Sequence, residues 1–148
     1  MTQIRRILFA TDFSNASAKA FATAMTLARA NRATMTILHV VVPFTPVVSE
    51  QYVGGEVLEE INVHTRRWSG QRIAKLTAKA KDRGVRGVGL LLEGDPAREI
   101  VRAARAKRAD LIVVGTHGRT GLHKFFVGSI AGRVVATAPC PVVTVRGR

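Results

Sequence analysis

Short apolar runs alternate with longer, helix-compatible segments along the chain. The apolar residues of each run are consecutive, which is typical of strands buried on both faces of a parallel sheet. The third run is the weakest, because Gly87 and Gly89 interrupt it. The pattern predicts strands over residues 7–10, 34–42, 88–92, 111–114 and 142–145.

The segments between these runs carry the signals of helices. In the first, Phe21, Ala24 and Ala28 recur at spacings of three and four residues, which places them on one helical face. Asp95 and Pro96 are typical of a helix start, because aspartate caps free amides and proline fits the first turn. We therefore expect helices over residues 14–30, 56–83 and 97–107, and a fourth that begins at residues 128–129 and stops before Pro139. The alternation predicts a single α/β domain over residues 1–148, with helices on both faces of an open, five-stranded parallel sheet.

Glycines follow the fourth predicted strand: Gly115, Gly118 and, after nine further residues, Gly128 with Ser129. Glycine lets backbone amides approach an anion closely, and the N-terminus of the next helix adds the positive end of its dipole. The pattern predicts a phosphate site, with Arg119 placed to neutralise a terminal phosphate. The alternative is that each glycine only turns the chain or precedes a helix.

A carboxylate, Asp12, stands directly after the first predicted strand. Ligands of open α/β sheets bind at the carboxyl ends of strands, where the strand order reverses. If the first and fourth strands both contribute, they must be neighbours, which predicts the order 3-2-1-4-5 instead of 2-1-3-4-5. Asp12 is expected to face a base amine, a ribose hydroxyl or a bridging cation. Its alternative role is to cap the first helix, for which Ser14 and Ser17 are also candidate caps. Val40, at the end of the second strand, is expected to offer its backbone to a purine edge.

Residues 7–14, 38–40, 94–96 and 138–145 resemble the universal stress protein family, and the likeness extends over essentially the whole chain. The spacing Gly115-x2-Gly118-x9-Gly128-Ser129 is similar to the glycine pattern of the ATP-binding branch of that family. The resemblance implies a Rossmann-like fold of the adenine nucleotide α-hydrolase-like type, with ATP as the ligand and ADP or AMP as alternatives. The residues implied to bind it are Ala10, Thr11, Asp12, Val40 and Val114 around adenosine, and Gly115, Gly118, Gly128, Ser129 and Ile130 around the phosphates.

The resemblance also implies an assembly and a biological role. Members of the family form homodimers through the last strand, where Val142, Val143 and Val145 would pair across a two-fold axis. They act as nucleotide-linked regulators of the stress response with slow or no hydrolysis, so any enzymatic activity is expected to be that of a weak ATPase. No catalytic or metal-ligating residue is assigned, and Mg²⁺ is expected only through the phosphates.

The chain has 23 Lys and Arg residues against 10 Asp and Glu residues, which gives a formal net charge of +13. This excess keeps a second function open, the nonspecific binding of polyanions such as nucleic acid by basic helices. An aromatic content of 5% disfavours base stacking. The predicted strand order also places the second and third helices on opposite faces, which disfavours one continuous basic patch.

A single cysteine, Cys140, excludes an internal disulfide and is typical of a reducing compartment, so we expect a cytoplasmic protein. The apolar runs are also too short for a membrane-spanning helix, which needs about 18 consecutive apolar residues.

Overall fold

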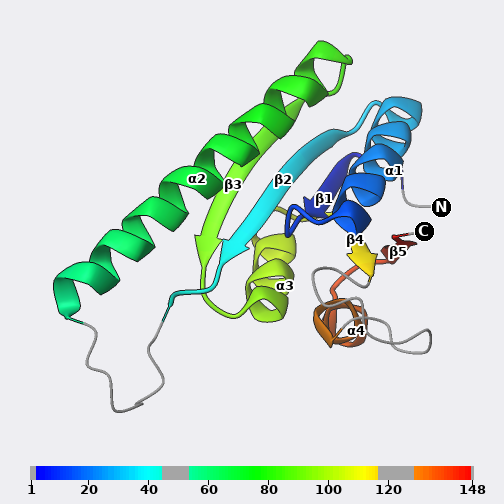
Figure 1. The fold of residues 1–148 in the computed structure, drawn as a ribbon. Coiled ribbons are helices and arrows are strands. Elements are labelled where there is room, and N and C mark those ends of the chain that lie inside the picture. The colour runs from blue at the N-terminus through cyan, green and yellow to red at the C-terminus, as the bar shows by residue number, and fades with distance from the viewer. Residues whose placement is uncertain (1–2, 45–53, 117–128, 148) are drawn as a thin grey trace.

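The computed structural model describes residues 3–44, 54–116 and 129–147, and over these residues it contains one parallel sheet with the strand order β3-β2-β1-β4-β5 (Figure 1). This order confirms the prediction that the first and fourth strands are neighbours. Every strand end lies within two residues of its expected position. The strands are β1 (Arg6–Ala10), β2 (Thr34–Val41), β3 (Gly87–Glu93), β4 (Leu111–Thr116) and β5 (Val142–Arg146).

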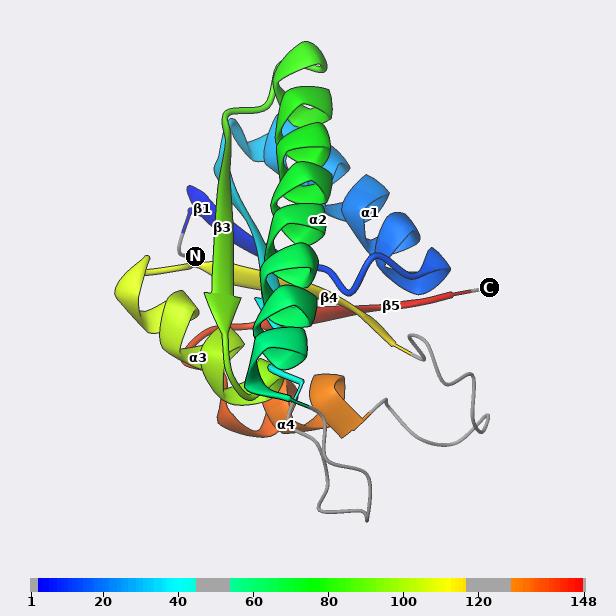
Figure 2. The ribbon, with the colours of Figure 1, turned by 60° about the vertical axis from the view of Figure 1, so that its left-hand side comes forward.

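Helices cover both faces of the sheet, as the continuous apolar strands predict. The first two, α1 (Asn15–Asn31) and α2 (Gly55–Asp82), pack on one face. The other two, α3 (Pro96–Ala106) and α4 (Ser129–Thr137), pack on the opposite face (Figure 2). The basic residues of α2 and α3 are therefore separated by the sheet.

Local capping explains where two of these helices begin. The Ser14 side chain accepts a hydrogen bond from the Ser17 amide at 3.2 Å, so Ser14 is the cap of α1 and not its first residue. The Asp95 side chain accepts one from the Arg98 amide at 3.0 Å, and Pro96 occupies the first position of α3, as its sequence predicts.

The central strand β1 divides the core into two halves, because successive strand residues point to opposite faces. Ile7 and Phe9 pack under α1 and α2, and the ring centroids of Phe9 and Phe21 lie 5.5 Å apart. Leu8 and Ala10 pack with residues of α3 and α4. The ends of β1, β2 and β4 are thereby held between two packed layers, and the sheet forms a rigid platform for the loops that follow them.

Candidate functional site

The carboxyl end of β1 lies between the corresponding ends of β2 and β4. Ala10 is opposite Leu38 on one side and Val114 on the other. The Thr11 amide continues the ladder with a 2.9 Å hydrogen bond to the Leu38 carbonyl. The sheet order thus brings the predicted residues of three separate strands to one edge, which is where open α/β sheets bind ligands.

Asp12 is half-buried at this edge, and its Oδ1 accepts a 2.9 Å hydrogen bond from the Ser14 amide. Burial raises the pKa of the Asp12 carboxyl, but hydrogen bonds from the side chain and amide of Ser14 and from the Ser17 side chain outweigh it and hold the pKa below its ordinary value of 3.8. Asp12 therefore carries a negative charge at neutral pH. Since Ser14 is the cap of α1, the alternative that Asp12 caps that helix is wrong.

Thr11 is buried and supports the turn that follows β1. Its Oγ1 donates to Ser17 Oγ at 3.0 Å and accepts from the Phe13 amide at 2.9 Å. The carbonyl oxygen of Thr11 lies 2.7 Å from Nδ1 of His39 on β2. The Thr11 side chain therefore stabilises the conformation of the turn that carries Asp12.

Three of the predicted lining residues share one face of the sheet. Ala10, Val40 and Val114 are all buried, with exposed fractions of 9%, 8% and 4%, and belong to the core beneath α3 and α4. Their side chains form the apolar floor of the carboxyl edge. Val40 is two residues beyond Leu38, the partner of Ala10, so it occupies the same level of the sheet as Asp12.

Packing within the fold requires glycine at position 115, whether or not a ligand binds there. A Cβ atom at this position would lie 2.9 Å from the Ala16 carbonyl carbon and 3.0 Å from the Ser17 amide nitrogen. Both are backbone atoms at the start of α1, and they cannot move aside cheaply. The close approach of β4 to α1 therefore requires glycine here, a reason that neither sequence interpretation gave.

The phosphate half of the predicted site falls largely outside the described residues. Gly118, Arg119 and Gly128 lie there, so their predicted roles stay predictions. Ser129 is the first residue of α4, as expected, and Ile130 in the same first turn is 42% exposed. The start of α4 is therefore accessible at Ile130.

An ion pair fixes α4 relative to α3. The guanidinium of Arg133 donates two hydrogen bonds to the Asp95 carboxylate, at 2.9 and 2.8 Å. The Arg133 side chain, followed by the Arg98 amide, holds the pKa of Asp95 below its ordinary value. The residue that caps α3 thus also orients the helix that follows the glycine pattern.

Several residues that lie near Asp12 in the structure were not predicted to belong to the site from the sequence. Phe13, directly after Asp12, contacts His39 of β2 and Trp68 and Arg72 of α2. These residues are distant from one another along the chain and match no motif. Only the packing of α2 over β2 brings them together.

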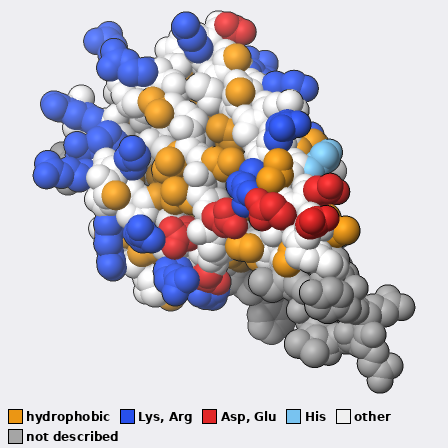
Figure 3. Space-filling model, turned by 90° about the vertical axis from the view of Figure 1, so that its left-hand side faces the viewer, with side chains coloured by type: hydrophobic (Ala, Val, Ile, Leu, Met, Phe, Trp, Pro, Cys, Tyr) orange, Lys and Arg blue, Asp and Glu red, His pale blue; other side chains and the backbone are white. Residues whose placement is uncertain are grey.

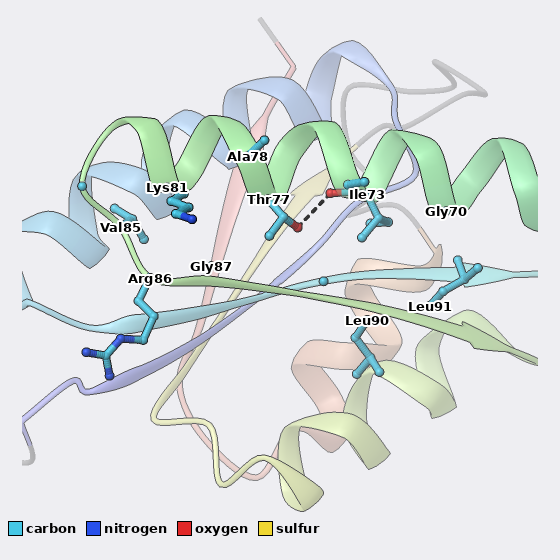
Figure 4. Close-up of a pocket in the computed structure, with 13 residues that line it drawn as sticks. Gly70, Ile73, Thr77, Ala78, Lys81, Val85, Arg86, Gly87, Leu90 and Leu91 are labelled. Atoms are coloured by element: carbon cyan, nitrogen blue, oxygen red, sulfur yellow. Dashed lines mark hydrogen bonds between the residues drawn. The ribbon is translucent and has the colours of Figure 1, made fainter.

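An open groove of about 860 Å³ lies away from this edge, between α2 and the edge strand β3 (Figure 4). Beside it, β3 presents glycines that let α2 pack closely: a Cβ atom on Gly89 would lie 2.6 Å from Ile73 Cγ2, and one on Gly87 would lie 3.1 Å from Ala80 Cβ. None of the predicted ligand-binding residues lines it.

The basic side chains of α2 and those of α3 lie on opposite faces of the sheet. Figure 3 shows Lys and Arg side chains dispersed around an apolar area and interrupted by Asp and Glu side chains. Arg66 pairs with Glu59 at 3.1 Å and with Glu93 at 3.5 Å, and Arg102 pairs with Glu99 at 3.5 Å. Some of the basic side chains of the described residues are thus paired with carboxylates.

Within residues 3–44, 54–116 and 129–147, no group of three or more His, Cys, Asp or Glu side chains is arranged to hold a metal ion. Among the helices of these residues, none is both long and apolar enough to cross a membrane.

The open parallel sheet, the position of Asp12 at a strand-order reversal and the helices on both faces define an α/β protein of the Rossmann-like class. The family model described as "Universal stress protein family" matches residues 3–146. The chain belongs to the universal stress protein family.

Curated relatives support this membership over the full length. The chain is 34% identical to the universal stress protein YxiE of Bacillus subtilis over 145 residues, which cover 95% of this chain and 98% of that protein. It is 37% identical over 142 residues to a universal stress protein of Thermus aquaticus, covering 96% of this chain and 98% of that protein.

Solved structures share the fold. The hypothetical protein MJ0577 has a TM-score of 0.83 at 23% identity, covering 98% of this chain and 97% of its own. A universal stress protein in complex with cAMP has a TM-score of 0.72 at 22% identity, covering 99% of this chain and all of its own. The Archaeoglobus fulgidus protein in complex with dAMP has a TM-score of 0.64 at 19% identity, covering 97% of this chain and 99% of its own.

Proposed function

We propose that this protein is a stress-response regulator that binds ATP at the carboxyl edge of β1 and β4, with slow or no hydrolysis. The observation that carries the proposal is the place of β1 between β2 and β4, which brings Asp12, Val40 and the start of the glycine pattern to one edge. Family membership and the cAMP and dAMP complexes of proteins with the same fold support an adenine nucleotide as the ligand.

The two halves of the nucleotide meet different chemistry in this proposal. Asp12 is ionised and accepts hydrogen bonds, so it suits the hydroxyl or amine donors of adenosine and would repel phosphates. The apolar floor of Ala10, Val40 and Val114 suits the base. The phosphates are assigned to the backbone at Gly118 and Gly128 and to the positive end of α4, with Mg²⁺ bound through the phosphates.

Turnover is proposed to be slow or absent, as the resemblance to the family implies. Phosphoryl transfer to water requires a group that orients the water as well as stabilisation of the developing charge. His39, the histidine next to this turn, directs its Nδ1 to the Thr11 carbonyl and so takes part in the support of the turn. The proposal assigns ATP a role as a bound signal.

Replacing Asp12 with alanine tests the adenosine assignment. Asp12→Ala is expected to weaken ATP and AMP binding by similar factors of about ten to a hundred, because a charge-assisted hydrogen bond common to both ligands is lost. Isothermal titration calorimetry at neutral pH measures both affinities. A loss confined to ATP would contradict the adenosine role and point to a bridging metal, and unchanged affinities would refute the site at this edge.

We further propose a homodimer through β5, an edge strand on which Val142, Val143 and Val145 are half-buried. Val143→Lys is expected to give monomers in sedimentation velocity experiments, because a charged side chain opposes edge pairing. Val88→Lys places the same charge on the other edge strand, β3, where Val88 is 49% exposed, and should leave the dimer intact. Thermal unfolding of Val143→Lys checks that its fold is retained, because Val143 also packs against the core. A Val143→Lys protein that stays dimeric would contradict this interface.

The cytoplasm is the proposed location, and Cys140 supports it. Burial, with the nearby charge of Asp110, raises the pKa of the Cys140 thiol above its ordinary value. The location is proposed because a single cysteine cannot form an internal disulfide, which is typical of a reducing compartment.

A further inference from the structure

Phe13 adopts a backbone conformation that aromatic residues rarely hold. Its φ angle is +63°, in the left-handed region, where a Cβ atom crowds the backbone. Such strain persists only when the surrounding structure determines the conformation, and it is concentrated in functional loops. Here it falls on the residue directly after Asp12.

Three side chains hold the Phe13 ring. The His39 ring from β2 lies at a centroid distance of 4.4 Å, and Trp68 from α2 meets the ring edge-on at 5.5 Å with an interplanar angle of 87°. The Arg72 guanidinium lies 5.0 Å from the centroids of both Phe13 and Trp68. Edge-to-face and cation–π contacts are directional, so they fix where the ring lies as well as burying it. We name Phe13, Trp68 and Arg72 the aromatic clasp.

The clasp acts on the same short turn that orients the Asp12 carboxylate. The Phe13 amide donates to Thr11 Oγ1, and the next amide, of Ser14, donates to Asp12 Oδ1, both at 2.9 Å. A change in the Phe13 backbone therefore moves the donor that holds Asp12. The turn connects α2, through one ring, to the carboxylate at the edge of the sheet.

We propose that Trp68 and Arg72 are positioning residues: they fix the strained Phe13 turn and thereby aim Asp12 at the adenosine half of the ligand. This inference rests on the proposed nucleotide function for its ligand, but the positioning itself is a property of the free protein. It assigns a role in the site to α2, a helix whose sequence carries no binding motif.

Truncation of the Trp68 ring is the first test. Trp68→Ala is expected to weaken AMP binding about tenfold in calorimetry, and Trp68→Phe, which keeps an aromatic edge, is expected to restore it to within about threefold. Val63→Ala is the matched control, because Val63 lies on the same helix and has the same exposed fraction of 39%. An unchanged affinity in Trp68→Ala, or an equal loss in Val63→Ala, overturns the proposal.

The second test removes the charge of Arg72 and compares it with the removal of another arginine on α2. Arg72→Gln is expected to weaken AMP binding about threefold, since the exposed cation–π contacts with Phe13 and Trp68 are lost. Arg67→Gln removes an exposed arginine that makes no ring contact with the clasp, and it should leave the affinity unchanged. Equal effects of the two substitutions would show a general charge effect and would refute a role for Arg72.

A double-mutant cycle separates action through Phe13 from direct contact of Trp68 with the ligand. Phe13→Gly removes the ring but tolerates the positive φ, so the turn remains accessible. If Trp68 acts through Phe13, adding Trp68→Ala to Phe13→Gly changes AMP affinity less than about twofold. A full tenfold loss in that background would contradict positioning and favour direct contact.

A measurement without nucleotide keeps this inference apart from the proposed function. Amide hydrogen exchange at Phe13 and Ser14 in the free protein is expected to be about tenfold faster in Trp68→Ala than in the wild type, with the amides of β1 unchanged. If the wild type binds no adenine nucleotide, the proposed function fails while faster exchange still supports the positioning of the turn. Unchanged exchange at both amides overturns the positioning, whatever the protein binds.

Discussion

Gly118→Val is expected to reduce ATP affinity at least about a hundredfold while the fold is retained, because a branched side chain would block the approach of backbone amides to the phosphates. The affinity that remains should be that of adenosine, so ATP, ADP and adenosine should bind the variant almost equally well. Titration calorimetry with all three ligands gives the comparison.

The control for this prediction is the stability of the variant. Thermal unfolding of Gly118→Val should match the wild type within about 2 °C, since Gly118 is assigned to the ligand and not to the core. The Asp12→Ala variant provides the contrast, because it should lower AMP and ATP affinity alike. Wild-type ATP affinity in Gly118→Val would reject the assignment of the phosphates to this glycine pattern.

Gly115→Val is expected to lower the stability of the fold, in contrast to Gly118→Val, which is expected to lower ATP affinity and leave the stability unchanged. The new Cβ atom would lie 2.9 Å from the Ala16 carbonyl carbon, and the valine methyl groups would add to this overlap. Overpacking against backbone should destabilise the protein by about 3 kcal/mol, which corresponds to a decrease in Tm of roughly 10 °C for a chain of this size. Thermal and urea unfolding measure the loss.

Gly70 is the matched control for Gly115. A Cβ atom at Gly70 meets nothing within 4 Å, so Gly70→Val should leave the stability unchanged or slightly higher, since a helical glycine is itself unfavourable. Gly115→Ala should give a smaller loss than Gly115→Val. A Gly115→Val protein as stable as Gly70→Val would show that β4 and α1 are not in close contact.

Together these variants separate two glycines that the sequence presents as one pattern. Gly115 and Gly118 are three residues apart and have the same expected role in a phosphate site. The structure gives Gly115 a contact with the backbone of α1, which is enough to require glycine there. Sequence spacing cannot distinguish a glycine that admits a ligand from one that admits a helix, because both need only the absence of a side chain.

Much of the fold was determined by the sequence alone. Continuous apolar strands required helices on both faces, and the requirement that Asp12 and the glycine pattern share one edge predicted the order 3-2-1-4-5, which the sheet confirms. Asp95 and Pro96 predicted the start of α3. The first helix begins at Asn15, one residue after the predicted start, because Ser14 is its cap. These features depend on neighbours in the chain or on the periodicity of one element.

The immediate surroundings of Asp12 were decided only by the tertiary structure. Nothing local indicates that Phe13 would take a positive φ, or that Trp68 and Arg72, more than fifty residues later, would hold its ring. Asp12 accepts a hydrogen bond from the Ser14 amide within this turn. A strained backbone is stabilised by contacts between distant segments, and such contacts exist only once α2 has packed against β2, so no pattern within one segment can encode them.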